Sequence, residues 1–237
     1  MSAAQPRAAA KATPEAAPRA TATPPHEPQS NRRRLTDDER THRAQQRRAA
    51  LIHRQTGRIL DAIALCFAER GYHETSVDQV VQRARMSKSA FYACFPNKEL
   101  AFAALLEREG ERLLHAVEQA IVDEPQPSNA ARAGIATFVA DCARNRDAAR
   151  ILLVESVGIS PVIEERRRAL HARFAEMIRA QAEASGRQPQ GIDLEVIAYA
   201  LVGAVNEAVV RLLETGRRDP TPVVDALGHL AARTLQP

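Results

Sequence analysis

Residues 75–99 (TSVDQVVQRARMSKSAFYACFPNKE) place hydroxyl, lysine and tyrosine side chains at short spacing. Ser87 is a good helix N-cap, so Lys88, Ser89 and Tyr92 should lie on the exposed face of a short helix. A lysine ammonium can donate to guanine O6 or N7, and a tyrosine hydroxyl can reach a phosphate. The spacing therefore predicts a helix that fits into the major groove of DNA.

Two further helices are needed to position these side chains. A Thr75…Asp78 capping pair is predicted to open the helix before the groove helix, and the valines that follow it should face a core. Upstream, apolar residues recur at helical spacing over 59–67, and Gly71 is expected to end that helix. The three helices together predict a helix-turn-helix unit.

The same region resembles the DNA-binding domain of the TetR family of bacterial repressors over about residues 54–105. The resemblance is carried by Glu69-Arg70-Gly71-Tyr72, Thr75-Ser76-Val77, Ser87-Lys88, Phe91-Tyr92, Phe95-Pro96 and Lys98-Glu99-Leu100. It implies an all-α fold, with an N-terminal three-helix helix-turn-helix domain and a larger C-terminal helical domain for ligand binding and dimerisation. Beyond residue 105 the resemblance is one of architecture only.

The residues predicted to contact DNA combine small polar, basic and aromatic side chains. They are Thr75, Ser76, Arg85, Ser87, Lys88, Ser89, Ala90, Tyr92 and Lys98. Arg85 stands where the family usually has a glycine, and a positive φ there would strain the backbone. Ala93 and Cys94 stand where relatives often carry Tyr or His. The alternative for Lys88 is an ordinary solvated lysine, and Cys94 could also be an oxidant-sensing thiol.

Composition is ordinary for a globular chain of 237 residues, with 45% hydrophobic and 26% charged residues. Residues 1–100 carry 17 basic and 10 acidic side chains, and the remainder carries 16 and 19, so the basic charge lies at one end. No apolar run of membrane-spanning length and no signal-peptide core occur, which predicts a cytoplasmic protein without membrane contact. Three cysteines without metal-ligand spacing predict neither disulfides nor zinc.

Four segments are predicted along the chain. Residues 1–35 form an Ala- and Pro-rich disordered tail, and residues 36–53 form a basic arm that can be helical, opened by a T-x-x-E capping box at Thr36. Residues 54–100 form the helix-turn-helix domain, and residues 101–237 form the sensing and dimerisation domain. The arm is either a solvated helix or a segment that contacts phosphates or a minor groove.

The C-terminal part offers two sets of candidate residues. Candidate walls of a ligand pocket, each also explained as plain core, are Phe102, Leu106, Leu113, Phe138, Leu152, Phe174, Tyr199 and Asn206. A helix over 194–213 is apolar on more than one face, so one face could pack on a second copy of the chain. The candidate dimer-interface residues are Leu201, Val205, Ala208, Leu212, Val224, Leu227 and Leu230.

The sequence thus predicts a transcriptional regulator, a ligand-released repressor that binds a palindromic operator as a homodimer. Its expected partners are double-stranded DNA, a second copy of the chain and an unidentified small-molecule effector, with no cofactor and no metal. No nucleophile–base, metal or phosphate-loop pattern is present, so no enzyme is predicted. The alternatives are a protein that coats DNA regardless of sequence and a transcriptional activator.

Overall fold

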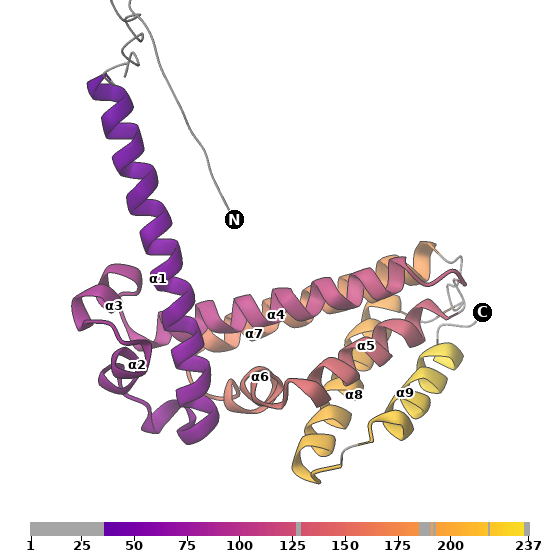
Figure 1. The fold of residues 1–237 in the computed structure, drawn as a ribbon. Coiled ribbons are helices and arrows are strands. Elements are labelled where there is room, and N and C mark those ends of the chain that lie inside the picture. Colours follow the sequence, from indigo (N-terminus) through magenta and orange to yellow (C-terminus); the bar gives the residue numbers. More distant parts are fainter. Residues whose placement is uncertain (1–35, 127–128, 185–190, 192, 218, 235–237) are drawn as a thin grey trace, which may run out of the picture. The chain divides into compact units, whose positions relative to one another are not determined.

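The computed structural model describes residues 36–126, 129–184, 191, 193–217 and 219–234, and all regular elements among them are helical (Figure 1). In chain order they are α1 (Asp37–Glu74), α2 (Val77–Ala84), α3 (Lys88–Cys94), α4 (Lys98–Val122), α5 (Ala130–Arg144), α6 (Arg146–Arg150), the π-helix η1 (Ile151–Glu155), α7 (Pro161–Ala184), α8 (Leu194–Glu214) and α9 (Thr221–Thr234). This confirms the predicted all-α fold class. The predicted tail, residues 1–35, lies outside the described residues, and the chain divides into two units, residues 1–43 and 44–237.

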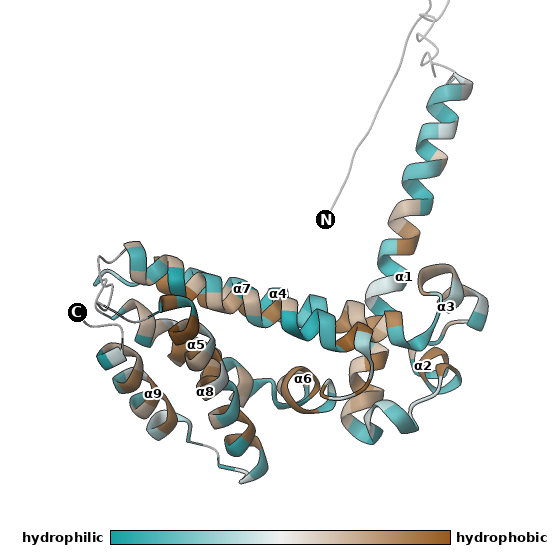
Figure 2. Ribbon diagram, turned by 180° about the vertical axis from the view of Figure 1, so that it is seen from behind, coloured by the Kyte–Doolittle hydropathy of each residue, from teal (hydrophilic) through white to brown (hydrophobic). Residues whose placement is uncertain are grey.

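Helix α1 begins with the predicted capping box. The amide of Thr36 donates to Glu39 Oε2 at 2.8 Å, and the amide of Glu39 donates to Thr36 Oγ1 at 3.2 Å. Residues 40–51 are exposed, and the first turns of α1 are hydrophilic in Figure 2. The backbone leaves helical geometry at Gly71 (φ 77°, ψ 172°), where a residue without a Cβ is favoured.

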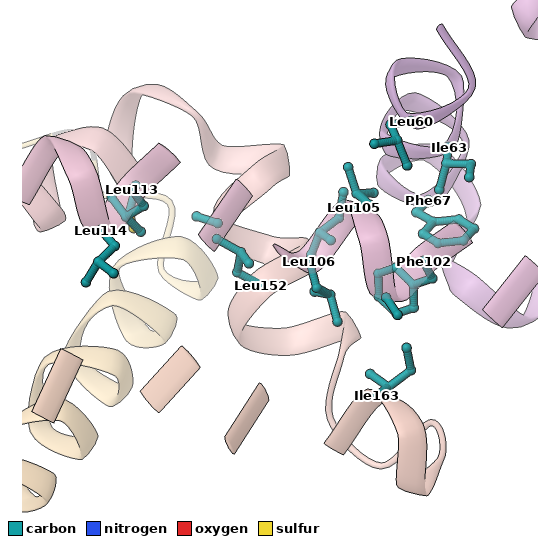
Figure 3. Close-up of a cluster of buried hydrophobic side chains, with 14 of the residues drawn as sticks. Leu60, Ile63, Phe67, Phe102, Leu105, Leu106, Leu113, Leu114, Leu152 and Ile163 are labelled. Atoms are coloured by element: carbon teal, nitrogen blue, oxygen red, sulfur yellow. The ribbon is translucent and has the colours of Figure 1, made fainter. Parts of the chain in front are cut away.

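The main apolar core of the second unit extends from the helix-turn-helix to the C-terminal helices, and a smaller cluster joins α7, α8 and α9. At the centre of the main core the ring of Phe67 from α1 lies edge-on to that of Phe102 from α4, with centroids 4.9 Å apart (Figure 3). Both side chains are almost fully buried. Truncating either to alanine removes a large apolar surface and leaves a cavity, at a cost of about 3–5 kcal/mol. The first turns of α4 are therefore held to α1 by a strong apolar contact.

The remaining helices form a bundle in which α5 packs against α4 and α9, and α7 packs against α4 and α8. Gly110 allows α4 to approach α7 closely, because a Cβ at this position would lie 2.7 Å from a methyl carbon of Leu170. Helix α8 is long and apolar enough to cross a membrane by length and composition alone. Core helices of globular proteins pass the same test, and α8 buries seven residues in this bundle. Packing in the bundle thus accounts for part of its apolar character.

Candidate nucleic-acid interface and effector cavity

Helix α2 is capped one residue later than the sequence analysis predicted. Ser76 is the N-cap, its Oγ accepts from the amide of Gln79 at 3.3 Å, and the amide of Ser76 donates to Gln79 Oε1 at 2.8 Å. Thr75 is buried, and its hydroxyl faces the carbonyls of Gly71 (2.9 Å) and Cys66 (3.3 Å). The predicted Thr75…Asp78 capping pair is therefore wrong. Thr75 closes the end of α1, whereas Ser76 stays exposed at the N-terminus of α2, where backbone N–H groups favour anions.

The turn between α2 and α3 is built on a left-handed residue. Arg85 has φ 52° and ψ 51°, and it is the one non-glycine residue with positive φ among those the structure describes. Its amide donates to the carbonyl of Gln82 at 3.1 Å, and Arg58 Nη2 donates to the carbonyl of Ala84 at 2.6 Å. The position where the family usually has a glycine thus has the positive φ that would strain an arginine. The Arg85 side chain is exposed, so it is free to contact DNA bound by α2 and α3.

Helix α3 presents the predicted groove face to solvent. Ser87 is its N-cap, with Oγ accepting from the amide of Ala90 at 3.2 Å and sharing a hydrogen bond with Ser89 Oγ at 2.8 Å. Lys88, Ser89 and Tyr92 are exposed, while Phe91 is fully buried and anchors the helix in the core. A short helix with one anchored side and one open polar side has the shape that major-groove reading requires.

Lys88 is held by a carboxylate in this conformation. Its Nζ lies 2.7 Å from Oδ1 of Asp78, which belongs to the first turn of α2, and both side chains are exposed. The hydrogen bond to Asp78 raises the pKa of Lys88 above its ordinary value. Lys88 and Asp78 thus face each other across the first turns of α2 and α3.

Lys98 is placed differently from the prediction of a phosphate contact. Its Nζ donates to the carbonyls of Tyr72 at 2.7 Å and Thr75 at 2.8 Å, and lies 4.1 Å from the centroid of the Tyr72 ring. Burial lowers its pKa. The ammonium ties the first turn of α4 to two carbonyls at the C-terminal end of α1, where a helix leaves acceptors open. This role could not be predicted from residue types, because the two partners of Lys98 are backbone atoms.

A cavity of about 80 Å³ lies among α4, α5, α7, α8 and α9. Its lining is almost wholly apolar and consists of Val117, Ile121, Ala131, Gly134, Ile135, Phe138, Phe174, Met177, Ile178, Gln181, Leu201, Val202, Val205, Asn206 and Ala231. The two side-chain amides are the polar groups in this lining. The Asn206 Nδ2 atom lies 3.2 Å from Nε2 of His171, whose pKa is lowered mainly by burial.

Three of the predicted pocket residues, Phe138, Phe174 and Asn206, line this cavity. The other five do not: Phe102 and Leu113 are buried in the core, Leu106 and Leu152 line a separate cavity of about 120 Å³, and Tyr199 is exposed on α8 and lines a surface groove of about 910 Å³. The aliphatic residues of the lining were not among the predicted pocket residues. The i, i+3, i+4 series Phe174, Met177 and Ile178 on α7 was the available signal, since these residues share one helix face.

The predicted dimer residues serve mainly the chain's own core. Leu201, Val205, Leu212, Val224 and Leu227 are buried within the single chain, Ala208 is half-buried, and Leu230 is 45% exposed. The apolar face that α8 leaves open is a different one and carries Val196 (63% exposed), Tyr199 (45%), Ala200 and Gly203. Most of the apolar residues of α8 lie inside the bundle, because the helix is covered by α5, α7 and α9.

Helix α3 with its exposed polar face and the capped helix α2 before it form a helix-turn-helix, the unit of a class of DNA-binding proteins. Residues 59–105 match the family model for bacterial regulatory proteins of the tetR family. A similar curated relative is the uncharacterized HTH-type transcriptional regulator YdgC of Bacillus subtilis (strain 168), which is 24% identical over 173 residues, covering 73% of this chain and 88% of that protein.

Solved structures agree with the family match. A TetR-like transcriptional regulator from Rhodococcus sp. RHA1 is 28% identical with a TM-score of 0.62, over 76% of this chain and 95% of that one. The regulator FadR from Bacillus subtilis in complex with stearoyl-CoA has the same fold, with 18% identity and a TM-score of 0.65 over 75% of this chain and 96% of that one. Residues 59–105 thus form a DNA-binding domain of the tetR family, and the chain is a transcriptional regulator of this kind and not an enzyme.

Proposed function

We propose that this chain is a homodimeric repressor that binds a palindromic operator in the cytoplasm and is released from it by an apolar effector. The observation that carries the DNA part is the open face of α3, where Lys88, Ser89 and Tyr92 are exposed above the buried anchor Phe91. Ser76 and Arg85 flank this face from the N-terminus of α2 and from the turn, where they can hold phosphates. Thr75 and Lys98 are supporting residues in this arrangement.

The effector part rests on the cavity. Its lining favours an aliphatic ligand, and Gln181 and Asn206 can orient one polar end. At about 80 Å³ the cavity is smaller than one of about 150 Å³ that holds benzene. A larger ligand must therefore push α5, α7 or α8 outward. The structure of FadR with stearoyl-CoA makes a long-chain acyl thioester a sensible first probe for this chain.

The homodimer part rests on the open apolar face of α8. A flat strip of Ala200 and Gly203 lets two helices approach closely, and the larger Val196 and Tyr199 beside it supply apolar area. Substituting Gly203 by glutamate would place a charge in the centre of this contact. Sedimentation should then shift from dimer to monomer, while Glu207→Lys on the same helix face tests whether charge alone has this effect.

The DNA-binding proposal is tested by fluorescence anisotropy on a duplex that wild-type protein selects from a randomised library. The affinity for the selected duplex should exceed the affinity for bulk DNA by roughly 10³-fold or more, and Lys88→Ala should lose most of this difference. A protein that coats DNA would be displaced in proportion to competitor length. Stearoyl-CoA should then lower the affinity and acetyl-CoA should not. Higher affinity with stearoyl-CoA would instead favour the ligand-dependent activator.

A further inference from the structure

A negative charge lies on the face that is proposed to meet DNA. Asp78 is 67% exposed and Lys88 is 58% exposed, and their charged atoms are 2.7 Å apart across the first turns of α2 and α3. Ion pairs with this exposure contribute little to folding stability. A carboxylate here is repelled by phosphates, so it opposes DNA binding unless it finds a hydrogen-bond donor on the DNA.

The major groove supplies such donors on two bases only, through the N4 amino group of cytosine and the N6 amino group of adenine. In a G·C pair the N4 donor lies beside the O6 acceptor of guanine. These two atoms are hydrogen-bonded to each other and so are about 2.9 Å apart. The lysine nitrogen and the aspartate oxygen are 2.7 Å apart, and they have the complementary order of donor and acceptor.

We propose that Asp78 is a specificity-determining residue that reads a G·C base pair jointly with Lys88. Lys88 donates to O6 and N7 of guanine, and Asp78 accepts from N4 of cytosine. An A·T pair also presents an acceptor beside a donor, but thymine gives the lysine one acceptor where guanine gives two. The inference rests on the proposed operator binding and adds to it the identity of one base pair in each half-site.

Asp78 should also lower the affinity of the protein for DNA that lacks the operator sequence. At a phosphate, or at a base pair that offers no amino group at this place, Asp78 has no donor and repels the nearby negative charge. In the free protein Asp78 also pairs with Lys88, which would otherwise bind phosphates without regard to sequence. Asp78 therefore lowers affinity for arbitrary DNA more than it lowers affinity for the operator.

The test is parallel selection from a randomised duplex library with the wild type, Asp78→Ala and Lys88→Ala. Asp61→Ala is the matched control, because it removes the same charge from an exposed ion pair of similar length, 2.8 Å to Arg108, outside α2 and α3. Wild type and control should select a G·C pair at one position of each half-site. Asp78→Ala and Lys88→Ala should both lose that preference, by roughly 10-fold in relative affinity. Asp78→Ala should also bind scrambled DNA more tightly.

Several outcomes would overturn the inference. Asp78→Ala could keep the preference at every position, the two variants could lose preferences at different positions, or the control could behave like Asp78→Ala. Both substituted side chains are exposed, and unchanged melting temperatures would exclude misfolding. A wild type that selects no sequence at all would instead refute the proposed operator binding, so the two failures are distinguishable.

Discussion

Replacing Arg85 by glycine should make the protein more stable and its DNA complex weaker. A residue with a Cβ in the left-handed region costs about 1–2 kcal/mol, and Arg85 has φ 52° and ψ 51°. Glycine removes this strain but gains freedom in the unfolded chain, which offsets about 0.4–1 kcal/mol. The Arg85 side chain is exposed and has no ion pair within the part of the chain that is described, so no contact is lost with it.

The net gain is about 0.5–1 kcal/mol in the free energy of unfolding, or about 2–3 °C in the melting temperature of a chain of this length. The assay is thermal and urea unfolding of the wild type, Arg85→Gly and Arg85→Ala. Alanine removes the same charge but keeps the Cβ, so it should show no comparable gain. Equal stability of the two variants, or a lower melting temperature for glycine, would refute the strain argument.

The same variants separate strain from DNA contact. Loss of the guanidinium should weaken operator binding equally in Arg85→Gly and Arg85→Ala. If the side chain contacts a phosphate, each variant should reduce the slope of log affinity against log salt by about 0.9. An unchanged slope would mean that the strained arginine is retained for a reason other than DNA affinity.

Three further predictions concern side chains that the helical frame positions. Lys98→Met should lower the melting temperature and leave the slope of log affinity for DNA against log salt unchanged, since Lys98 donates to two carbonyls. A slope reduced by about 0.9 would instead show that Lys98 contacts a phosphate. Asp141→Asn should cost about 2 kcal/mol at neutral pH, because Asp141 accepts two hydrogen bonds from Arg112. The hydrogen bond from Arg112 lowers the pKa of Asp141. The carboxylate therefore stabilises the fold above its unfolded pKa of about 3.9, and this contribution is lost as the pH falls through the lower folded pKa. Urea titrations should show that the free energies of unfolding of wild type and variant converge at such low pH. Ala131→Leu should fill the cavity and abolish the response to stearoyl-CoA without changing DNA affinity, and a retained response would place the effector elsewhere.

The sequence was most informative where local chemistry decides the structure. The cap at Ser87, the left-handed turn residue at Arg85 and the break at Gly71 follow from hydroxyl spacing and from the family pattern, and all three are found in the structure. The N-cap of α2 was misplaced by one residue because Thr75 and Ser76 are chemically equivalent caps. Only the position of the α1 carbonyls determines that the threonine turns inward.

Contacts distant in sequence were harder to predict. The apolar residues of α8 follow a helical pattern on several faces, but the pattern does not say which face a neighbouring helix covers. Leu201 and Leu212 were therefore expected at a dimer interface and instead lie in the core. In the same way, the cavity is bounded by five helices, and its walls depend on how these helices cross.

Helix α4 lines the cavity through Val117 and Ile121 and packs on α1, and ion pairs link it to both α1 and α5. Asp61, Arg108, Glu109, Arg112 and Asp141 form a continuous series from α1 through α4 to α5, with contacts of 2.8–3.1 Å. The Asp61 end is 70% exposed and therefore contributes little. The Asp141 end is 9% exposed and bidentate, so separating it leaves a charge without its partner in a poorly hydrated place. An effector that parts α5 from α4 must break this contact, while the packed rings of Phe67 and Phe102 join α4 to α1.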